Sequence, residues 1–171
     1  MRTLFADTFY WAALLNPKDQ WHQEVRRFNQ TLGTVQLFTT DEVLTEFLNF
    51  FSGFEPPIKQ GAVQRTELIL QNAMVQVQVI PQSRNTFSSG LRLYSQRLDK
   101  GYSLTDCISM QIMKSFSITE VLTHDKHFAQ EGFTVLFRCF SAGPKPPPSS
   151  LSTISKLRWP DFDSGRTHVT S

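Results

Sequence analysis

Residues 103–125, SLTDCISMQIMKSFSITEVLTHD, hold a helix followed by a short strand, and this order decides the fold class. The segment 103–116 is apolar on nearly every side of a helical wheel, which predicts a buried helix. The segment 120–123 is a short run that ends at polar residues, which predicts a short strand. A buried helix that leads into a strand is typical of an α/β domain.

The same alternation of helices and strands extends over residues 1–140. Further strands are predicted at 4–6, 35–39, 75–80 and 133–137, and further helices at 8–15, 17–32, 40–54, 58–74, 85–100 and 126–131. Pro17 suits the first turn of its helix, and Pro56-Pro57 is expected to end the helix before it. The pattern predicts a mainly parallel central sheet flanked by helices.

Residues 141–171 differ from the rest of the chain. Five of the nine prolines lie in these 31 residues, and proline blocks both helices and central strands. We therefore predict one domain at 1–140 and a flexible Pro/Ser-rich tail at 141–171. The tail holds four basic and two acidic residues, so residues 1–140 carry 13 of each sign. A neutral domain must hold an anionic partner by local contacts.

Composition excludes several classes of protein. Of the 171 residues, 40% are hydrophobic and 19% charged, which is typical of a globular domain and not of a disordered chain. The two cysteines, Cys107 and Cys139, form no CxxC motif, so neither a disulfide framework nor a zinc site is expected. No signal peptide and no apolar run of ~20 residues is present, which favours a cytoplasmic protein with no membrane partner.

Four acidic residues lie where a parallel sheet would place a ligand. Asp7 and Asp125 follow predicted strands, and ligands bind beyond the carboxyl ends of such strands. Glu46 lies at the edge of an apolar helix face, and Asp106 lies on the buried helix, where an isolated carboxylate is unfavourable. Structural alternatives stay open: the strand-end acids could be helix N-caps, Glu46 a rim residue, and Asp106 part of a capping box with Ser103.

Acids gathered in one place would repel one another and raise each other's pKa unless a cation neutralised them. Mg²⁺ and Mn²⁺ take oxygen ligands, and no Cys/His ligand set accompanies these acids. The acids therefore suggest Mg²⁺ or Mn²⁺ and phosphodiester chemistry, in which the metal activates water for attack on phosphorus.

Four segments, in this order, resemble the PIN-domain family, and especially the nucleases of VapC-type toxins and their stand-alone relatives. They are Phe5-Ala-Asp7-Thr8, Leu44-Thr-Glu46-Phe-Leu-Asn49, Tyr102-Ser-Leu-Thr-Asp106-Cys and Val121-Leu-Thr-His-Asp125-Lys-His-Phe128. The resemblance covers roughly residues 2–140 and implies a Rossmann-like α/β domain that acts as a metal-dependent endoribonuclease.

The resemblance also implies roles and partners. Asp7 and Asp106 would be the principal ligands of Mg²⁺ or Mn²⁺, and Glu46 and Asp125 would complete the catalytic pocket, directly or through water. The substrate would be RNA, and the partner an antitoxin protein, with a homodimer as a further alternative. The rival interpretation is a PIN-fold scaffold that binds RNA or protein with little or no catalysis.

Several neighbouring residues are left with open or minor roles. Asp99, Thr8, Thr105 and Thr123 flank the acids and could be structural or part of the site. Asn49 is expected to face away from Glu46, and His124 and His127 are expected to face solvent. The preferred interpretation of the Phe-rich stretch Phe47, Phe50, Phe51 and Phe54 is that it belongs to the core. The alternative is a groove for an antitoxin segment or a homodimer surface. Basic residues that could hold RNA are scattered: Lys18, Arg26, Arg27, Arg84, Lys100, Lys114 and Lys126.

Overall fold

The computed structural model describes residues 1–71 and 76–137 of the chain. The tail predicted at 141–171 and Cys139 lie outside the described residues. So do residues 72–75, where the helix expected at 58–74 was to end and the strand expected at 75–80 was to begin. Within the described ranges, no helix combines the length and the apolar character needed to cross a membrane.

The described strands form one parallel sheet with the order β3-β2-β1-β4-β5. The strands are β1 (Arg2–Ala6), β2 (Val35–Thr40), β3 (Val77–Ile80), β4 (Glu120–Leu122) and β5 (Thr134–Val135). All four pairings between them are parallel, which confirms the predicted sheet. The strand order reverses at β1: β2 and β3 lie on one side of it and β4 and β5 on the other. Such a reversal opens a crevice beyond the carboxyl ends of β1 and β4.

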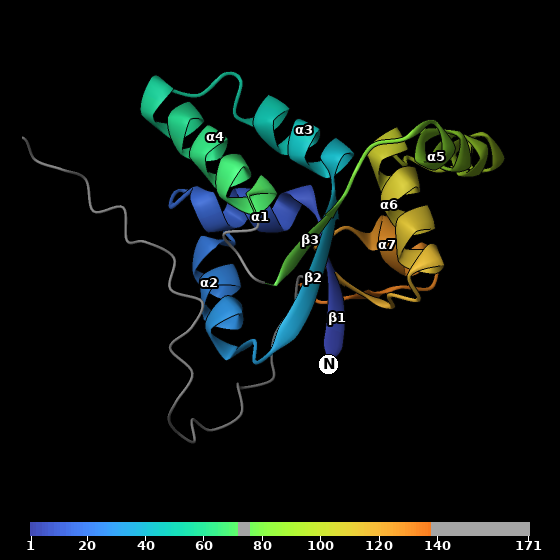
Figure 1. Cartoon of the computed structure of the whole chain (residues 1–171), viewed down its shortest axis with the longest axis horizontal. Coiled ribbons are helices and arrows are strands. Elements are labelled where there is room, and N and C mark those ends of the chain that lie inside the picture. The colour runs from blue at the N-terminus through green and yellow to red at the C-terminus, as the bar shows by residue number, and fades with distance from the viewer. Residues whose placement is uncertain (72–75, 138–171) are drawn as a thin grey trace, which may run out of the picture.

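Helices cover the sheet on both sides (Figure 1). They are α1 (Thr8–Leu15), α2 (His22–Thr31), α3 (Asp41–Phe50), α4 (Pro56–Leu70), α5 (Arg84–Gln96), α6 (Leu104–Ser115) and α7 (Lys126–Gln130). Helices α1, α2 and α4 lie on one side of the strands, and α5, α6 and α7 lie on the other. The three-layer α/β architecture is the one that alternating strands and helices predict.

The elements that carry the acids are anchored in the core. Leu4, Phe5 and Ala6 of β1 are fully buried, as are Met110 and Met113 of α6. A carboxylate attached to such elements has little freedom to move toward solvent. The burial of α6 also confirms the prediction from its apolar helical wheel.

Helices α2 and α4 begin farther from their predicted starts than the other helices do. Helix α2 begins at His22 and not at Pro17, because the side chains of Asn16 and Asp19 accept hydrogen bonds from the backbone amides of Lys18 and Trp21. Such local bonds hold the chain in turns and compete with helix formation. Pro56 begins α4, where a missing N–H is harmless in the first turn, and α3 already ends at Phe50, so the Pro-Pro pair marks a start and not the expected stop.

Gly90 lets α5 approach α6, the helix that carries Asp106. A Cβ atom at Gly90 would lie 2.3 Å from Ile108 Cγ1 and 3.0 Å from the Ile108 backbone. Gly90→Ala is therefore expected to lower the free energy of unfolding by about 1–3 kcal/mol, measured by urea unfolding. Gly61→Ala in α4 is the matched control, since its Cβ meets only Leu15 Cδ1 at 3.4 Å. Equal effects of the two substitutions would contradict this close packing.

Candidate active site

All four predicted acids line one open pocket of about 440 Å³. Asp7 follows β1, Asp125 follows β4, Glu46 comes from the middle of α3, and Asp106 comes from the first turn of α6. The pocket therefore lies at the carboxyl edge of the sheet, beside the point where the strand order reverses. The expected convergence of the acids is confirmed, and their chemical roles stay a prediction.

Asp7 is the most deeply buried of the four acids, with 6% of its surface exposed. Burial first, and then the charges of Asp106 and Glu46, raise the pKa of Asp7 to about 7, although hydrogen bonds from the Thr123 hydroxyl and the Thr8 backbone amide lower it. Asp7 occupies the N-cap position of α1, yet its side chain makes no capping hydrogen bond. The N-cap alternative therefore does not explain this carboxylate.

Glu46 is held by a hydroxyl from the neighbouring helix. Thr8 Oγ1 donates a hydrogen bond of 2.5 Å to Glu46 Oε2, which links the first turn of α1 to α3. Burial raises the pKa of Glu46, the charge of Asp106 adds to the rise, and the bond from Thr8 opposes it. Thr8 thus lines the pocket and contacts one of its acids, and its role in the chemistry stays a prediction.

Asp106 is both a helix cap and a pocket residue. The Ser103 amide donates to Asp106 Oδ2 at 2.8 Å, and the Asp106 amide donates to Ser103 Oγ at 3.0 Å, which completes a capping box. Burial raises the pKa of Asp106, and the charge of Asp125 also raises it. The hydrogen bonds with Ser103 lower it. Among the described residues, no hydrogen bond reaches its Oδ1. The capping role thus leaves one oxygen available in the pocket.

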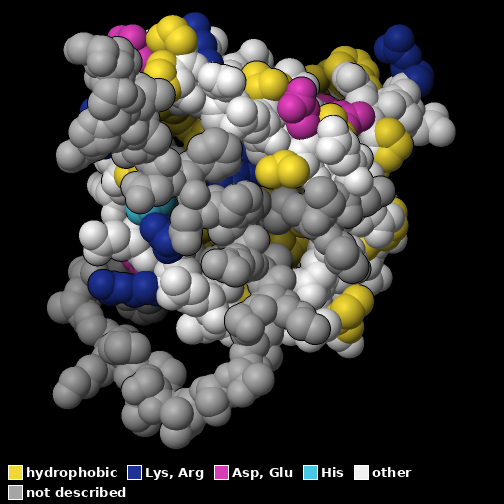
Figure 2. Space-filling view, turned by 60° about the vertical axis from the view of Figure 1, so that its left-hand side comes forward, with side chains coloured by type: hydrophobic (Ala, Val, Ile, Leu, Met, Phe, Trp, Pro, Cys, Tyr) yellow, Lys and Arg dark blue, Asp and Glu magenta, His cyan; other side chains and the backbone are white. Residues whose placement is uncertain are grey.

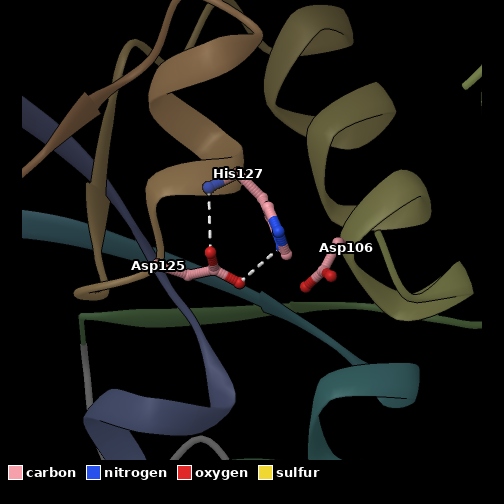
Figure 3. A group of neighbouring side chains, drawn as sticks. All are labelled: Asp106, Asp125 and His127. Carbon is pink, nitrogen blue, oxygen red and sulfur yellow. Dashed lines mark hydrogen bonds and ion pairs between the residues drawn. The ribbon is translucent and has the colours of Figure 1, made fainter. Parts of the chain in front are cut away.

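Asp125 caps α7 and contacts a histidine that was expected to face solvent. Asp125 Oδ1 accepts a hydrogen bond of 2.8 Å from the His127 amide, and Oδ2 lies 3.0 Å from His127 Nδ1. The His127 side chain is only 22% exposed, and its ring lies beside Asp106 as well (Figure 3). The expectation for His127 is therefore wrong. Helix α7 spans five residues, too few for a helical wheel to show which side faces the pocket.

The remaining candidates divide between the pocket and the surface. Thr8, Thr123 and Asn49 line the pocket, and Asn49 is exposed, as expected for a side chain that faces solvent. Neither Asp99 nor Thr105 lines it, and the Asp99 side chain is 69% exposed beside Lys100.

His124 is exposed as expected, although its ring packs on Phe9 at the rim with centroids 4.3 Å apart. Phe47 and Phe51 are core residues, whereas Phe50 is 49% exposed and lines the pocket.

The charged side chains that line the pocket are chiefly carboxylates. Within the described part of the chain, no Lys or Arg lines the pocket. On the face shown in Figure 2, the described Lys and Arg side chains lie apart from one another, as the scattered sequence positions suggested. Negative charge is thus concentrated where burial already disfavours it. This donor set of carboxylate and hydroxyl oxygens fits a hard divalent cation such as Mg²⁺ or Mn²⁺.

Comparison with known proteins identifies the fold. No model of a protein family matches the chain, and no curated protein matches it. Among solved structures, the Mycobacterium tuberculosis toxin VapC20, described as cleaving the sarcin–ricin loop, is similar with a TM-score of 0.67 and 21% identity. The match covers 77% of this chain and 96% of VapC20. The chain therefore has the PIN-domain α/β fold of a VapC toxin, which confirms the resemblance at the level of the fold.

Proposed function

We propose that this chain is a metal-dependent endoribonuclease that hydrolyses RNA phosphodiester bonds, and that it is the toxin component of a toxin–antitoxin system. The observation that carries the proposal is the convergence of four carboxylates in one pocket that no Lys or Arg of the described residues lines. The fold shared with VapC20, a toxin described as cleaving the sarcin–ricin loop, supports both the nuclease and the toxin assignment.

Asp7 and Asp106 would hold Mg²⁺ or Mn²⁺, and Glu46 and Asp125 would complete the site directly or through water. A divalent ion bound there supplies Lewis acidity, which lowers the pKa of water and offsets charge that develops on the phosphoryl group. The raised pKa values of Asp7, Glu46 and Asp106 support this assignment, because a cation would remove the repulsion that contributes to them.

The chain's own residues would fix the carboxylates before substrate arrives. Thr8 holds Glu46 through its hydroxyl, and Ser103 holds Asp106 through the capping box. Prepositioned carboxylates need no rearrangement during the reaction, which is the condition for strong electrostatic stabilisation of a transition state.

Aromatic side chains at the rim favour an RNA substrate with unstacked bases. Phe9, Phe50 and His124 line the pocket together with the acids. Bases of single-stranded RNA stack on such rings, and each stack contributes about 1–3 kcal/mol. Because no Lys or Arg of the described residues lines the pocket, we expect stacking to supply much of the local affinity there.

Phe50→Ala is expected to raise the KM for RNA by at least ~5-fold and to change kcat less, because a stacking contact acts on substrate binding. Steady-state cleavage of a short RNA measures both constants. Phe116→Ala is the matched control: Phe116 is 45% exposed but does not line the pocket. An unchanged KM for the Phe50 variant, or an equal rise for the Phe116 variant, would contradict a stacking role.

The proposal extends to partners and organisation. An antitoxin segment or a second copy of the chain would be the protein partner, and the cytoplasm would be the compartment. Residues 1–140 would form the nuclease domain, with 141–171 as an appended tail.

Cleavage of structured RNA by the purified chain tests the function. RNA should be cut with Mg²⁺ or Mn²⁺ and left intact with EDTA, while DNA of the same sequence should be cut far more slowly. Cleavage that EDTA does not affect would contradict the metal-dependent mechanism. RNA binding without cleavage under any metal would instead favour the scaffold alternative.

A further inference from the structure

We propose that His127 is a further protein ligand of the bound metal, on the side of the site where Asp106 and Asp125 lie, and that its nitrogen makes the site prefer Mn²⁺ to Mg²⁺. This role rests on the proposed function, because it assigns a residue to the metal of that same pocket. The sequence motifs gave His127 no such role.

The three side chains are close enough to share one ion. One ligand atom from each of Asp106, Asp125 and His127 can be chosen so that all lie within 4.8 Å of one another. Two ligands on opposite sides of an ion, each at about 2.1 Å, lie about 4.2 Å apart. Small side-chain rotations would therefore bring all three into contact with one ion. Figure 3 shows that the side chains, from α6 and from the start of α7, point toward one another.

His127 Nδ1 is a buried nitrogen without a hydrogen bond. Among the described residues, no donor or acceptor meets it with hydrogen-bond geometry, although Asp125 Oδ2 lies 3.0 Å away. A buried polar atom without a well-aligned hydrogen bond is uncommon in folded proteins, and the ion pair with Asp125 satisfies this one only when the ring is protonated. A metal ion between the two carboxylates and the ring would be a partner of suitable charge for all three groups.

The imidazole ring is held in place from its other side. The Tyr102 ring packs against it with centroids 5.1 Å apart. The Tyr102 hydroxyl donates to Glu131 at 3.3 Å, and Glu131 is fixed in turn by Arg97 at 2.7 Å. A ring positioned by packing loses little freedom on binding a metal, which is how supporting residues commonly prepare a histidine ligand.

The nitrogen of the His127 ligand decides the metal preference. Mg²⁺ binds oxygen ligands almost entirely and keeps several waters, whereas transition metals accept imidazole nitrogen. Replacing the nitrogen should therefore weaken Mn²⁺ binding more than Mg²⁺ binding. We expect His127→Gln to weaken Mn²⁺ binding by at least ~10-fold and Mg²⁺ binding by a smaller factor.

Pulsed electron paramagnetic resonance of Mn²⁺ bound to the full chain tests this assignment directly. The electron spin echo should be modulated by a ¹⁴N nucleus, and labelling the histidines with ¹⁵N should replace that modulation. This measurement needs no substitution, so it does not depend on whether a variant folds. The modulation should disappear in His127→Gln and persist in His124→Gln, the matched control at the rim of the same pocket.

The outcomes separate this inference from the proposed function. Mn²⁺ that binds the wild type without nitrogen modulation, or modulation lost in His124→Gln and kept in His127→Gln, would overturn the role of His127 alone. Mn²⁺ binding that Asp106→Asn leaves unchanged would place the metal elsewhere and overturn the site itself. Failure of the wild type to bind Mn²⁺ would overturn both.

Discussion

Asp7→Asn is expected to raise the free energy of unfolding of the metal-free protein by up to about 4 kcal/mol at pH 8. The pKa of Asp7 is about 7 in the folded protein, against a usual value of 3.8, chiefly because of burial. The folded state therefore binds this proton more tightly than the unfolded state does. Between about pH 4 and pH 7 the folded protein loses this contribution to its stability as pH rises, and above pH 7 the loss is complete.

Urea unfolding from pH 4 to pH 8 in EDTA, with wild type and variant side by side, measures this effect. The stability difference between the two proteins should be small at pH 4, where Asp7 is protonated and resembles Asn, and should grow as pH rises. Asp99→Asn is the control, since Asp99 is 69% exposed and its substitution should give a difference that varies little with pH. A stability difference for Asp7→Asn that stays flat across this range would contradict the proposed burial of charge.

Asp106→Asn is expected to remove most of the stabilisation that Mn²⁺ gives the folded protein. A metal that binds only the folded state at 100 times its Kd adds about 2.7 kcal/mol to the free energy of unfolding. The variant should gain far less, because it lacks one of the two proposed principal ligands. Its stability without metal should be equal or higher, since Asn can still accept the hydrogen bond from the Ser103 amide and no longer repels Asp7 and Asp125.

Ser103→Ala separates capping from metal binding at the same helix end. It removes the hydroxyl that accepts from the Asp106 amide, so the metal-free protein should lose about 1 kcal/mol. The Mn²⁺ stabilisation should persist, because the Asp106 carboxylate remains. Thermal unfolding with and without Mn²⁺ compares the three proteins. Equal gains for wild type and Asp106→Asn would show that Asp106 is only a helix cap.

The parallel sheet could be predicted from the sequence because its strands are short apolar runs separated by helices. Ligands of such sheets bind beyond the carboxyl ends of the strands, so the positions of Asp7 and Asp125 followed from the strand ends. The starts of α2 and α4 did not follow, because side-chain bonds to Lys18 and Trp21 amides and the tolerance of Pro56 in a first turn are local effects.

The places of Asn49 and His127 at the pocket were not foreseen, for a common physical reason. A helical wheel places a side chain relative to its own axis and does not show which neighbouring element faces it. Asn49 lies on the exposed side of α3, yet the first turns of α1 and α6 border the pocket there. His127 lies in a helix of five residues, and only the fold brings Asp106 beside it. Such contacts join residues that are distant in sequence.

The rate of RNA cleavage by wild type, Asp106→Asn and Asp99→Asn, at saturating Mn²⁺ and after addition of EDTA, tests the central claim most directly. If the acidic pocket is a metal-dependent ribonuclease site, Asp106→Asn should be slower by at least ~100-fold, which corresponds to about 3 kcal/mol of lost transition-state stabilisation. Asp99→Asn should match the wild type, and EDTA should stop both. Equal cleavage by Asp106→Asn and the wild type would contradict the assignment of this pocket as the active site.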